Sequence, residues 1–332
     1  MSELTKIYQQ MKFMHIARQK KLEPLYLKIL RSIGLRPYGI FPQDPNIFKP
    51  AYLAKRIGVD PKTIKAHLAG MEKTGFIRFY QVYPNFRHLG IEGSAYLFRS
   101  DDEDRKVRLI QELEPIEGLL EVHNFIGPEM CVDLSYRSVS DLDSKLRRLC
   151  KLIGDDTPIQ FYERHMPEVS RPLSKDDWRI LKSLRYRARR PLREAAEEIG
   201  VNLKTFRRRF ERMAQDGSFF IAPALDPSKA PGLVLFELLV YTTPDADRTT
   251  IQRVLSITDD HYVYHYVPSM QRLGNFDSLA FAQSTGEIEE LRQQVRYVPG
   301  VAKVSALVFR GWNDYTKWID SAIDAKIEDP TT

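Results

Sequence analysis

The residues with the clearest chemical potential are lysines and arginines that follow a helical spacing near 203–213 of the 332-residue sequence. In that run Phe206, Phe210 and Met213 recur at intervals of three and four, which predicts a helix that buries one stripe of side chains. The outward positions are Lys204, Thr205, Arg207, Arg208 and Arg209. Because arginine pairs with guanine edges and with phosphates, this helix is predicted to bind double-stranded DNA.

A second basic run lies just upstream, between Trp178 and Arg193. It holds seven basic residues and no acidic one, and this local density indicates a polyanionic partner more clearly than the net charge of +6 does. Four of its arginines are predicted to contact phosphates: Arg185, Arg187, Arg189 and Arg190. A run of like charge is also typical of a plain solvated surface, and that alternative stays open.

A weaker version of the same pattern begins at Asp60 and Pro61, a typical helix start. Its outward residues include Lys62, Thr63 and Lys65. Two interpretations stay open: this helix adds weak phosphate contacts, or it serves mainly as a scaffold for the stronger copy.

These motifs belong to an internal duplication, in which residues 53–64 align without gaps on 195–206 at an offset of 142. Each copy starts with short helices joined through a glycine turn and followed by a strand-like run, such as 76–84, that is predicted to form a wing hairpin. The pattern that follows is strand, helix, strand, strand, helix, strand, which predicts a ferredoxin-like βαββαβ domain. The predicted class is therefore α+β, with two copies of a winged helix-turn-helix and a ferredoxin-like domain.

The sequence divides into six predicted segments. They are an N-terminal amphipathic helix (1–21), a winged helix-turn-helix (22–88), a ferredoxin-like domain (89–170), a second winged helix-turn-helix (171–230), a second ferredoxin-like domain (231–311), and a C-terminal helix and tail (312–332).

Signatures of catalysis are sparse. The sequence has no glycine-rich phosphate loop, no H-E-x-x-H, no G-x-S-x-G and no paired cysteine motif. His123 and His265 stand at equivalent strand positions of the two copies, but a lone strand histidine is more often a core residue. Cys131 and Cys150 lie in apolar segments, and the other histidines lack the spacing of metal ligands. These observations predict no enzyme, no cofactor and no metal site.

Residues 199–217, IGVNLKTFRRRFERMAQDG, are similar to the helix, turn, recognition helix and closing glycine of the Lrp/AsnC (leucine-responsive, feast/famine) transcription regulators. That family joins a winged helix-turn-helix to a ferredoxin-like, RAM-type domain, so the resemblance spans about residues 22–311 in two copies. It implies a regulator of transcription that binds double-stranded DNA, with one chain supplying both halves of a pseudo-dimer. Further homodimerisation stays open.

The same family carries a G-x-[YF]-D-x-L pattern beside a small-molecule, usually amino-acid, effector site. Residues 274–279 match the pattern in full, so the resemblance implies effector contacts from Gly274, Phe276 and Asp277. The corresponding run 127–132 of the first copy lacks the aspartate.

Two other functions stay open as hypotheses. The segment His123-Asn124-Phe125 resembles the H-N-Y segment of siroheme decarboxylases, enzymes of the same domain order whose sheet domain places further arginines and histidines around a tetrapyrrole pocket. Those further residues are not apparent in the sequence, where only Arg272 lies near His265. The third hypothesis is that the winged helices dock another protein, and the arginine-dense second copy argues against it.

Composition sets the outer limits of these hypotheses. The sequence is 43% hydrophobic and 28% charged, which is typical of globular domains. It has no run of about 20 uncharged apolar residues and no apolar signal core near residue 1, so no membrane partner and a cytoplasmic location are expected.

Overall fold

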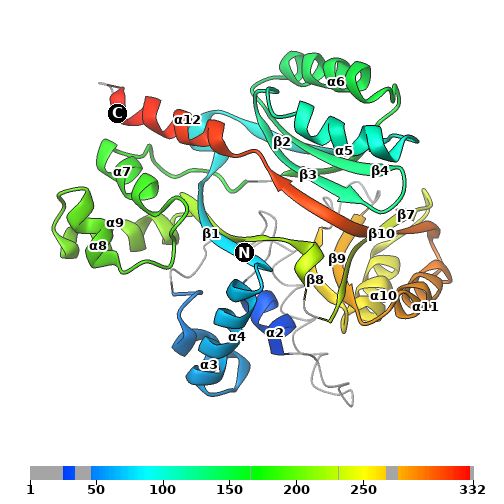
Figure 1. The fold of residues 1–332 in the computed structure, drawn as a ribbon, viewed down its shortest axis with the longest axis horizontal. Helices are drawn as coiled ribbons and strands as arrows, with labels where there is room; N and C mark the ends of the chain where they lie inside the picture. Colours follow the sequence, from blue (N-terminus) through cyan, green and yellow to red (C-terminus); the bar gives the residue numbers. More distant parts are fainter. Residues whose placement is uncertain (1–24, 34–45, 165, 231, 267–275, 330–332) are drawn as a thin grey trace.

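The computed structural model describes residues 25–33, 46–164, 166–230, 232–266 and 276–329 (Figure 1). The predicted N-terminal helix, Gly274 and Arg272 lie outside these ranges. Within them the chain contains two helical units and two antiparallel four-stranded sheets, each sheet with two helices on one face. This architecture confirms the predicted α+β class of duplicated helix-turn-helix and ferredoxin-like folds.

The first helical unit owes its turn and caps to residues that the sequence marks plainly. Gly58 adopts a φ of 82°, a left-handed conformation that glycine tolerates, and the Asp60 side chain accepts a hydrogen bond from the Lys62 amide at 2.7 Å. Ile64, Leu68 and Met71 form the buried stripe of the second helix of the motif. The helices are α2 (Leu25–Ile33), α3 (Pro50–Ile57) and α4 (Pro61–Lys73).

The second helical unit repeats this arrangement. Ser174 and Asp177 form a capping box at its start, and Phe206, Phe210 and Met213 are buried as predicted. Its helices are α7 (Lys175–Leu184), α8 (Leu192–Glu198) and α9 (Leu203–Gln215).

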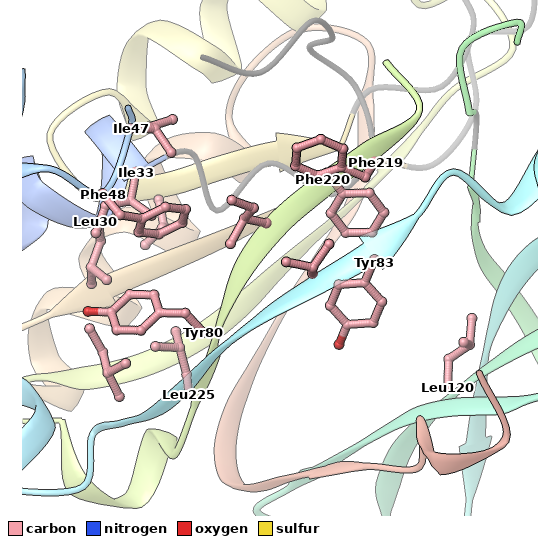
Figure 2. Close-up of a cluster of buried hydrophobic side chains, with 14 of the residues drawn as sticks. Leu30, Ile33, Ile47, Phe48, Tyr80, Tyr83, Leu120, Phe219, Phe220 and Leu225 are labelled. Carbon is pink, nitrogen blue, oxygen red and sulfur yellow. The ribbon is translucent and has the colours of Figure 1, made fainter. Parts of the chain in front are cut away.

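The wing hairpin predicted for residues 76–84 is wrong. That segment forms one strand, β1 (Ile77–Pro84), which pairs with β6 (Phe219–Leu225) of the other copy, from Ile77 opposite Leu225 to Pro84 opposite Phe219. Alternation predicts a strand but not its partner, because the pairing residues lie about 140 positions apart. Figure 2 shows Tyr83 of β1 next to Phe220 of β6, and these two rings stack with centroids 4.9 Å apart.

The first sheet has the strand order β5-β2-β4-β3, and α5 and α6 cover its outer face (Figure 1). After the short helix η1 (Phe86–Leu89), its elements are β2 (Glu92–Arg99), α5 (Glu103–Glu112), β3 (Leu119–Phe125), β4 (Glu129–Tyr136), α6 (Val139–Ile153) and β5 (Ile159–Arg164).

The second sheet has the equivalent order β10-β7-β9-β8, with α10 and α11 on its outer face (Figure 1). After the short helix η2 (Pro227–Lys229), its elements are β7 (Val234–Thr242), α10 (Arg248–Thr258), β8 (Tyr262–Tyr266), β9 (Phe276–Ala282), α11 (Thr285–Arg296) and β10 (Val301–Asp314).

Strand β10 belongs to both sheets. Its first half pairs with β7, and after a register break between Phe309 and Gly311 its last residues pair with β3. Trp312, expected at the start of the final helix, therefore lies in this strand, and the helix α12 (Lys317–Glu328) follows it. Since β10 joins β3, the two sheets form one eight-stranded sheet.

The helix-free faces of the two sheets meet in one hydrophobic core, which also contains the stripes of both helical units. The outer faces carry separate, smaller cores under their own helix pairs. In Figure 2, Leu30, Ile33 and Phe48 of the first helical unit lie on one side of Tyr80 of β1, and the Phe48 and Tyr80 rings meet edge to face with centroids 5.1 Å apart. None of the helices in the described ranges combines the length and the apolar character required to cross a bilayer.

Candidate functional site

A group of polar side chains lies on the helix-free face of the first sheet, and we call it the inter-sheet polar group. Adjacent strands bring its members together: β3 supplies two, β4 one and β5 two. Because directly opposite residues share a face, Ala95 of β2 lies beside both Asp133 and Tyr162, and Gly93 lies beside Arg164. The members are Glu121, His123, Asp133, Tyr162 and Arg164.

Hydrogen bonds and ion pairs connect the five side chains. Arg164 contacts Asp133 directly, and the Tyr162 hydroxyl donates to the same carboxylate at 2.8 Å. The Arg164 Nη2 atom also lies 3.5 Å from Glu121 Oε2, which in turn lies 3.4 Å from His123 Nε2. One guanidinium therefore joins two carboxylates and, through Glu121, an imidazole.

Gly93 makes room for the arginine. A Cβ atom at that position would lie 2.8 Å from Cδ of Arg164 and 3.2 Å from its Cβ and Cγ. Only a residue without a side chain lets the Arg164 stem lie flat across β2.

Burial controls the electrostatics of the group. Burial raises the pKa of Asp133, the charge of Glu121 raises it further, and the hydrogen bond from Tyr162 opposes the rise. His123 Nδ1 and Asp133 Oδ1 are buried without a hydrogen-bond partner. A histidine, an arginine and two carboxylates in an apolar surrounding can bind an anion and transfer a proton.

The second sheet faces this group with two acids instead of a cation. Glu237 and Asp277 are both fully buried, and burial raises the pKa of Asp277. Burial also raises the pKa of the Cys131 thiol, and the charges of Asp133, Glu237 and Asp277 raise it further.

The predicted effector residues are thus separated. Asp277 points into the space between the sheets, whereas Phe276 belongs to the core under α10 and α11. Gly274 lies outside the described residues.

Matching the registers of the two sheets shows how the copies have diverged. Leu279 stands where the first copy has Asp133, Leu307 where it has Tyr162, and Phe309 where it has Arg164. Only the first sheet therefore carries the full polar group.

Aromatic rings enclose His123. Its ring centroid lies 4.3 Å from Trp312, 5.3 Å from Phe309 and 6.2 Å from Phe125. His123 is 1% exposed. The imidazole therefore lies in an aromatic surrounding formed by β3 and β10.

The residues predicted to bind DNA on α9 fall into two sets. Lys204, Arg207 and Arg208 are exposed, and Thr205 is partly buried. Arg209 instead donates to Ser174 Oγ and Asp177 Oδ1, both at 3.0 Å, and so stabilises the start of α7.

Most of the upstream arginines are bound to other residues of the protein. Arg185 is 4% exposed, and it donates to Asp320 at 2.9 Å, to Gln81 at 3.0 Å and to the Val82 carbonyl at 2.9 Å. These contacts hold the Arg185 guanidinium against other elements of the fold and away from the exposed face of α9, so the structure does not place it where DNA would bind that helix.

Arg189 and Arg190 are also engaged, with Glu72 and Tyr80 in the first case and Glu198 in the second. Arg187 is two-thirds exposed. On α4, Lys62 and Lys65 are exposed and Thr63 is partly buried.

Sequence reasoning missed four members of the inter-sheet polar group: Glu121, Asp133, Tyr162 and Arg164. A signal was present, because Glu121 and Asp133 are acidic residues inside otherwise apolar strands, LLEVHNF and EMCVDLSY. Among the described residues no cluster of three or more His, Cys, Asp or Glu is placed to hold a metal ion.

Comparisons with known proteins extend this description. No protein-family model matches the chain, and a search of curated proteins finds no match. Among solved structures, the siroheme decarboxylase NirDL in complex with an iron-uroporphyrin III analogue is similar over 91% of this chain and 99% of that one, with a TM-score of 0.52 and 14% identity. A second structure of siroheme decarboxylase NirDL gives 90% and 99% coverage, a TM-score of 0.52 and 13% identity.

The regulators match a smaller part of the chain. An AsnC family transcriptional regulator from Agrobacterium tumefaciens is similar over 41% of this chain and 89% of that one, with a TM-score of 0.33 and 16% identity. A regulator of the expected Lrp/AsnC family is thus among the similar solved structures, over about two fifths of this chain. The expectation that the chain is not an enzyme is wrong, because the structures that share its duplicated fold over nine tenths of its length are those of an enzyme.

Proposed function

We propose that the chain is an enzyme that removes carboxylate groups from an iron tetrapyrrole of the uroporphyrin III class. The observation that carries the proposal is the inter-sheet polar group, in which a buried arginine lies beside acids and a histidine. The fold shared with siroheme decarboxylase NirDL supports it.

The reaction breaks the bond between a side-chain carbon of the macrocycle and its carboxylate carbon. Carbon dioxide leaves, and the electron pair left on the side chain takes up one proton. No oxidant or reductant is needed. The protein must hold a carboxylate, shield it from water and supply a proton.

The members of the group suit these three tasks. Arg164 would bind a substrate carboxylate by a charge-assisted hydrogen bond, in exchange for part of its contact with Asp133 or Glu121. The surrounding core excludes water, which strengthens electrostatic interactions. His123, with one ring nitrogen beside Glu121 and the other unpartnered, is placed to deliver the proton.

The test is incubation of the purified protein with iron uroporphyrin III, followed by mass spectrometry for the loss of one carbon dioxide per reacting carboxylate. We expect His123→Gln to slow this loss at least about 100-fold, and Arg164→Lys to weaken binding seen as a shift of the macrocycle's absorption band. His67→Gln on α4 and Arg310→Lys on β10 are matched controls away from the group and should behave as wild type. Unchanged turnover in His123→Gln would remove that residue from the reaction, and no turnover in wild type would refute the proposal.

A second candidate function is binding of double-stranded DNA through α9. Lys204, Arg207 and Arg208 are exposed side by side on a helix of the helix-turn-helix motif, and this observation favours it. The finer hypothesis of a sequence-specific regulator rests on the same helix. The further hypothesis of a small-molecule effector rests on the sequence pattern around Phe276 and Asp277.

This second function is tested by titrating a labelled duplex at several salt concentrations. The double variant Arg207→Ala, Arg208→Ala should bind at least about tenfold more weakly and reduce the slope of affinity against salt by roughly one for each phosphate that the protein no longer neutralises. The double variant Arg147→Ala, Arg148→Ala removes two neighbouring arginines from α6 and serves as control. Equal affinity of the two double variants would exclude α9 as the DNA-binding helix.

A further inference from the structure

Trp312 covers the histidine of the inter-sheet polar group. It stands directly opposite His123 in the pairing of β10 with β3, so both rings lie on the same face, and their centroids are 4.3 Å apart. The indole is partly exposed whereas the imidazole is buried. Any ligand that reaches this face of His123 must therefore displace the indole.

The contact leaves both rings incompletely satisfied. His123 Nδ1 and Trp312 Nε1 are buried, and each lacks a hydrogen-bond partner. Buried polar atoms of this kind cost stability unless something pairs with them. The arrangement of these two rings is therefore not optimised for their own hydrogen bonding.

The indole packs against two other rings. The Phe309 ring lies nearly parallel to the indole, at 14° and with centroids 5.7 Å apart, and the His123 ring centroid lies 4.3 Å from the indole and 5.3 Å from Phe309. A planar conjugated macrocycle gains the same kind of contact from these rings.

The backbone beside Trp312 is also irregular. The pairing changes register between Phe309 and Gly311, and a Cβ atom at Gly311 would have open space around it. The segment that carries Trp312 begins at this break.

We propose that the planar ring of the tetrapyrrole takes the place of the Trp312 indole against Phe309 and His123, so that Trp312 is a positioning residue that must move when the ligand enters. This inference rests on the proposed decarboxylase function. It predicts that affinity is limited by the fraction of molecules in which the indole has left His123.

A reversible cross-link tests the inference. Asn124 and Gly311 are directly opposite each other, and opposite residues on antiparallel strands lie about 4.5–5.5 Å apart between Cα atoms, within the range of a disulfide. They neighbour the His123 and Trp312 pair and so point to the other face of the sheet, where a disulfide would not touch the rings of His123, Phe309 and Trp312. The variant is Asn124→Cys, Gly311→Cys, with the two single substitutions as controls.

The probe is iron uroporphyrin III, and binding is followed by the shift of its absorption band. The oxidised double variant should bind at least about tenfold more weakly than the same protein after reduction, because the cross-link holds Trp312 over His123. Recovery on reduction shows that the variant is folded. Equal affinity in the oxidised and reduced states would overturn the inference and leave the decarboxylase proposal intact, whereas no binding by wild type would overturn both.

Trp312→Ala gives an independent measurement. Removal of the cover should raise the association rate of the probe severalfold, whereas Trp318→Ala, which alters a neighbouring indole that donates to the Leu119 carbonyl, should not. An association rate that stays at the wild-type value in Trp312→Ala would contradict the inference, since a purely structural tryptophan would change stability and not this rate.

Discussion

A single glycine lets Arg164 reach the acids of the first sheet. We predict that Gly93→Ala destabilises the protein by about 1–3 kcal/mol, because a Cβ atom there meets Arg164 Cδ at 2.8 Å. Denaturant unfolding of Gly93→Ala in the wild-type and Arg164→Ala backgrounds checks the cause. The added cost of Gly93→Ala should fall in the second background, where Cδ and Cγ are gone. An equal cost in both backgrounds would mean that the glycine is needed for another reason.

The buried carboxyl group of Asp314 should make the stability of the protein fall as pH rises. It lies directly opposite Glu121, and burial together with the charge of Glu121 raises its pKa from 3.8 to about 7, although Arg78 contacts it and opposes the rise. Between these values the folded state binds more protons than the unfolded state, so the free energy of unfolding contributed by Asp314 falls as pH rises from about 4 to about 7.

The measurement compares wild type with Asp314→Asn across this range. The difference in their free energies of unfolding should decline by at most about 1.4 kcal/mol for each pH unit and level off outside the range. A difference that stays flat between pH 4 and pH 7 would show that Asp314 titrates normally.

At the scale of elements, acidic residues of α12 pair with two basic residues of the run that precedes α8. Arg185 donates to Asp320 of α12 and to the carbonyls of Val82 and Thr316, and its guanidinium stacks on Tyr83. Lys182 also pairs with Asp324 of the same helix. Arg185, which the sequence suggests as a phosphate ligand, thus connects the end of α7 to β1 and α12.

We predict that two arginines of the same helical unit behave oppositely in unfolding experiments. The free energy of unfolding of Arg185→Ala should fall by about 1–3 kcal/mol for each buried group left without a partner. That of Arg208→Ala should stay within about 0.5 kcal/mol of the wild-type value. Thermal or urea unfolding of both variants is the measurement. Comparable stability of the two would place Arg185 outside the core.

These elements also show what the sequence could reveal. The helices and the strand order of each ferredoxin-like unit follow from local periodicity, and so does the buried stripe of α9. The partner of β1, the neutralisation of Arg185 and the meeting of Glu121, Asp133 and Arg164 depend on residues far apart in the chain, for which a pattern along one segment holds no signal. His123 could be singled out, but not the arginine that makes its surroundings chemically useful.

At the scale of the whole molecule, the duplication produces one central core rather than two. Residues from both sheets, both helical units, β1 and β6 belong to the same hydrophobic cluster. Neither copy can therefore bury its helix-free sheet face without the other.

We predict that the chain unfolds in a single calorimetric transition in spite of its length. The calorimetric and van't Hoff enthalpies should agree, and Leu279→Ala in the central core should lower the midpoint of the whole transition without splitting it. Two resolved transitions would show that the copies are stable independently.

The strand shared by the two sheets also sets an order of events during synthesis. Until Asp314 has been translated, β3 has no neighbour on one side and presents an open edge of unpaired amides and carbonyls. At a ribosomal rate of about 5–20 residues per second, that edge waits roughly 10–40 s after its own residues are made. During this interval the unpaired edge of β3 is open to pairing with a strand of another chain.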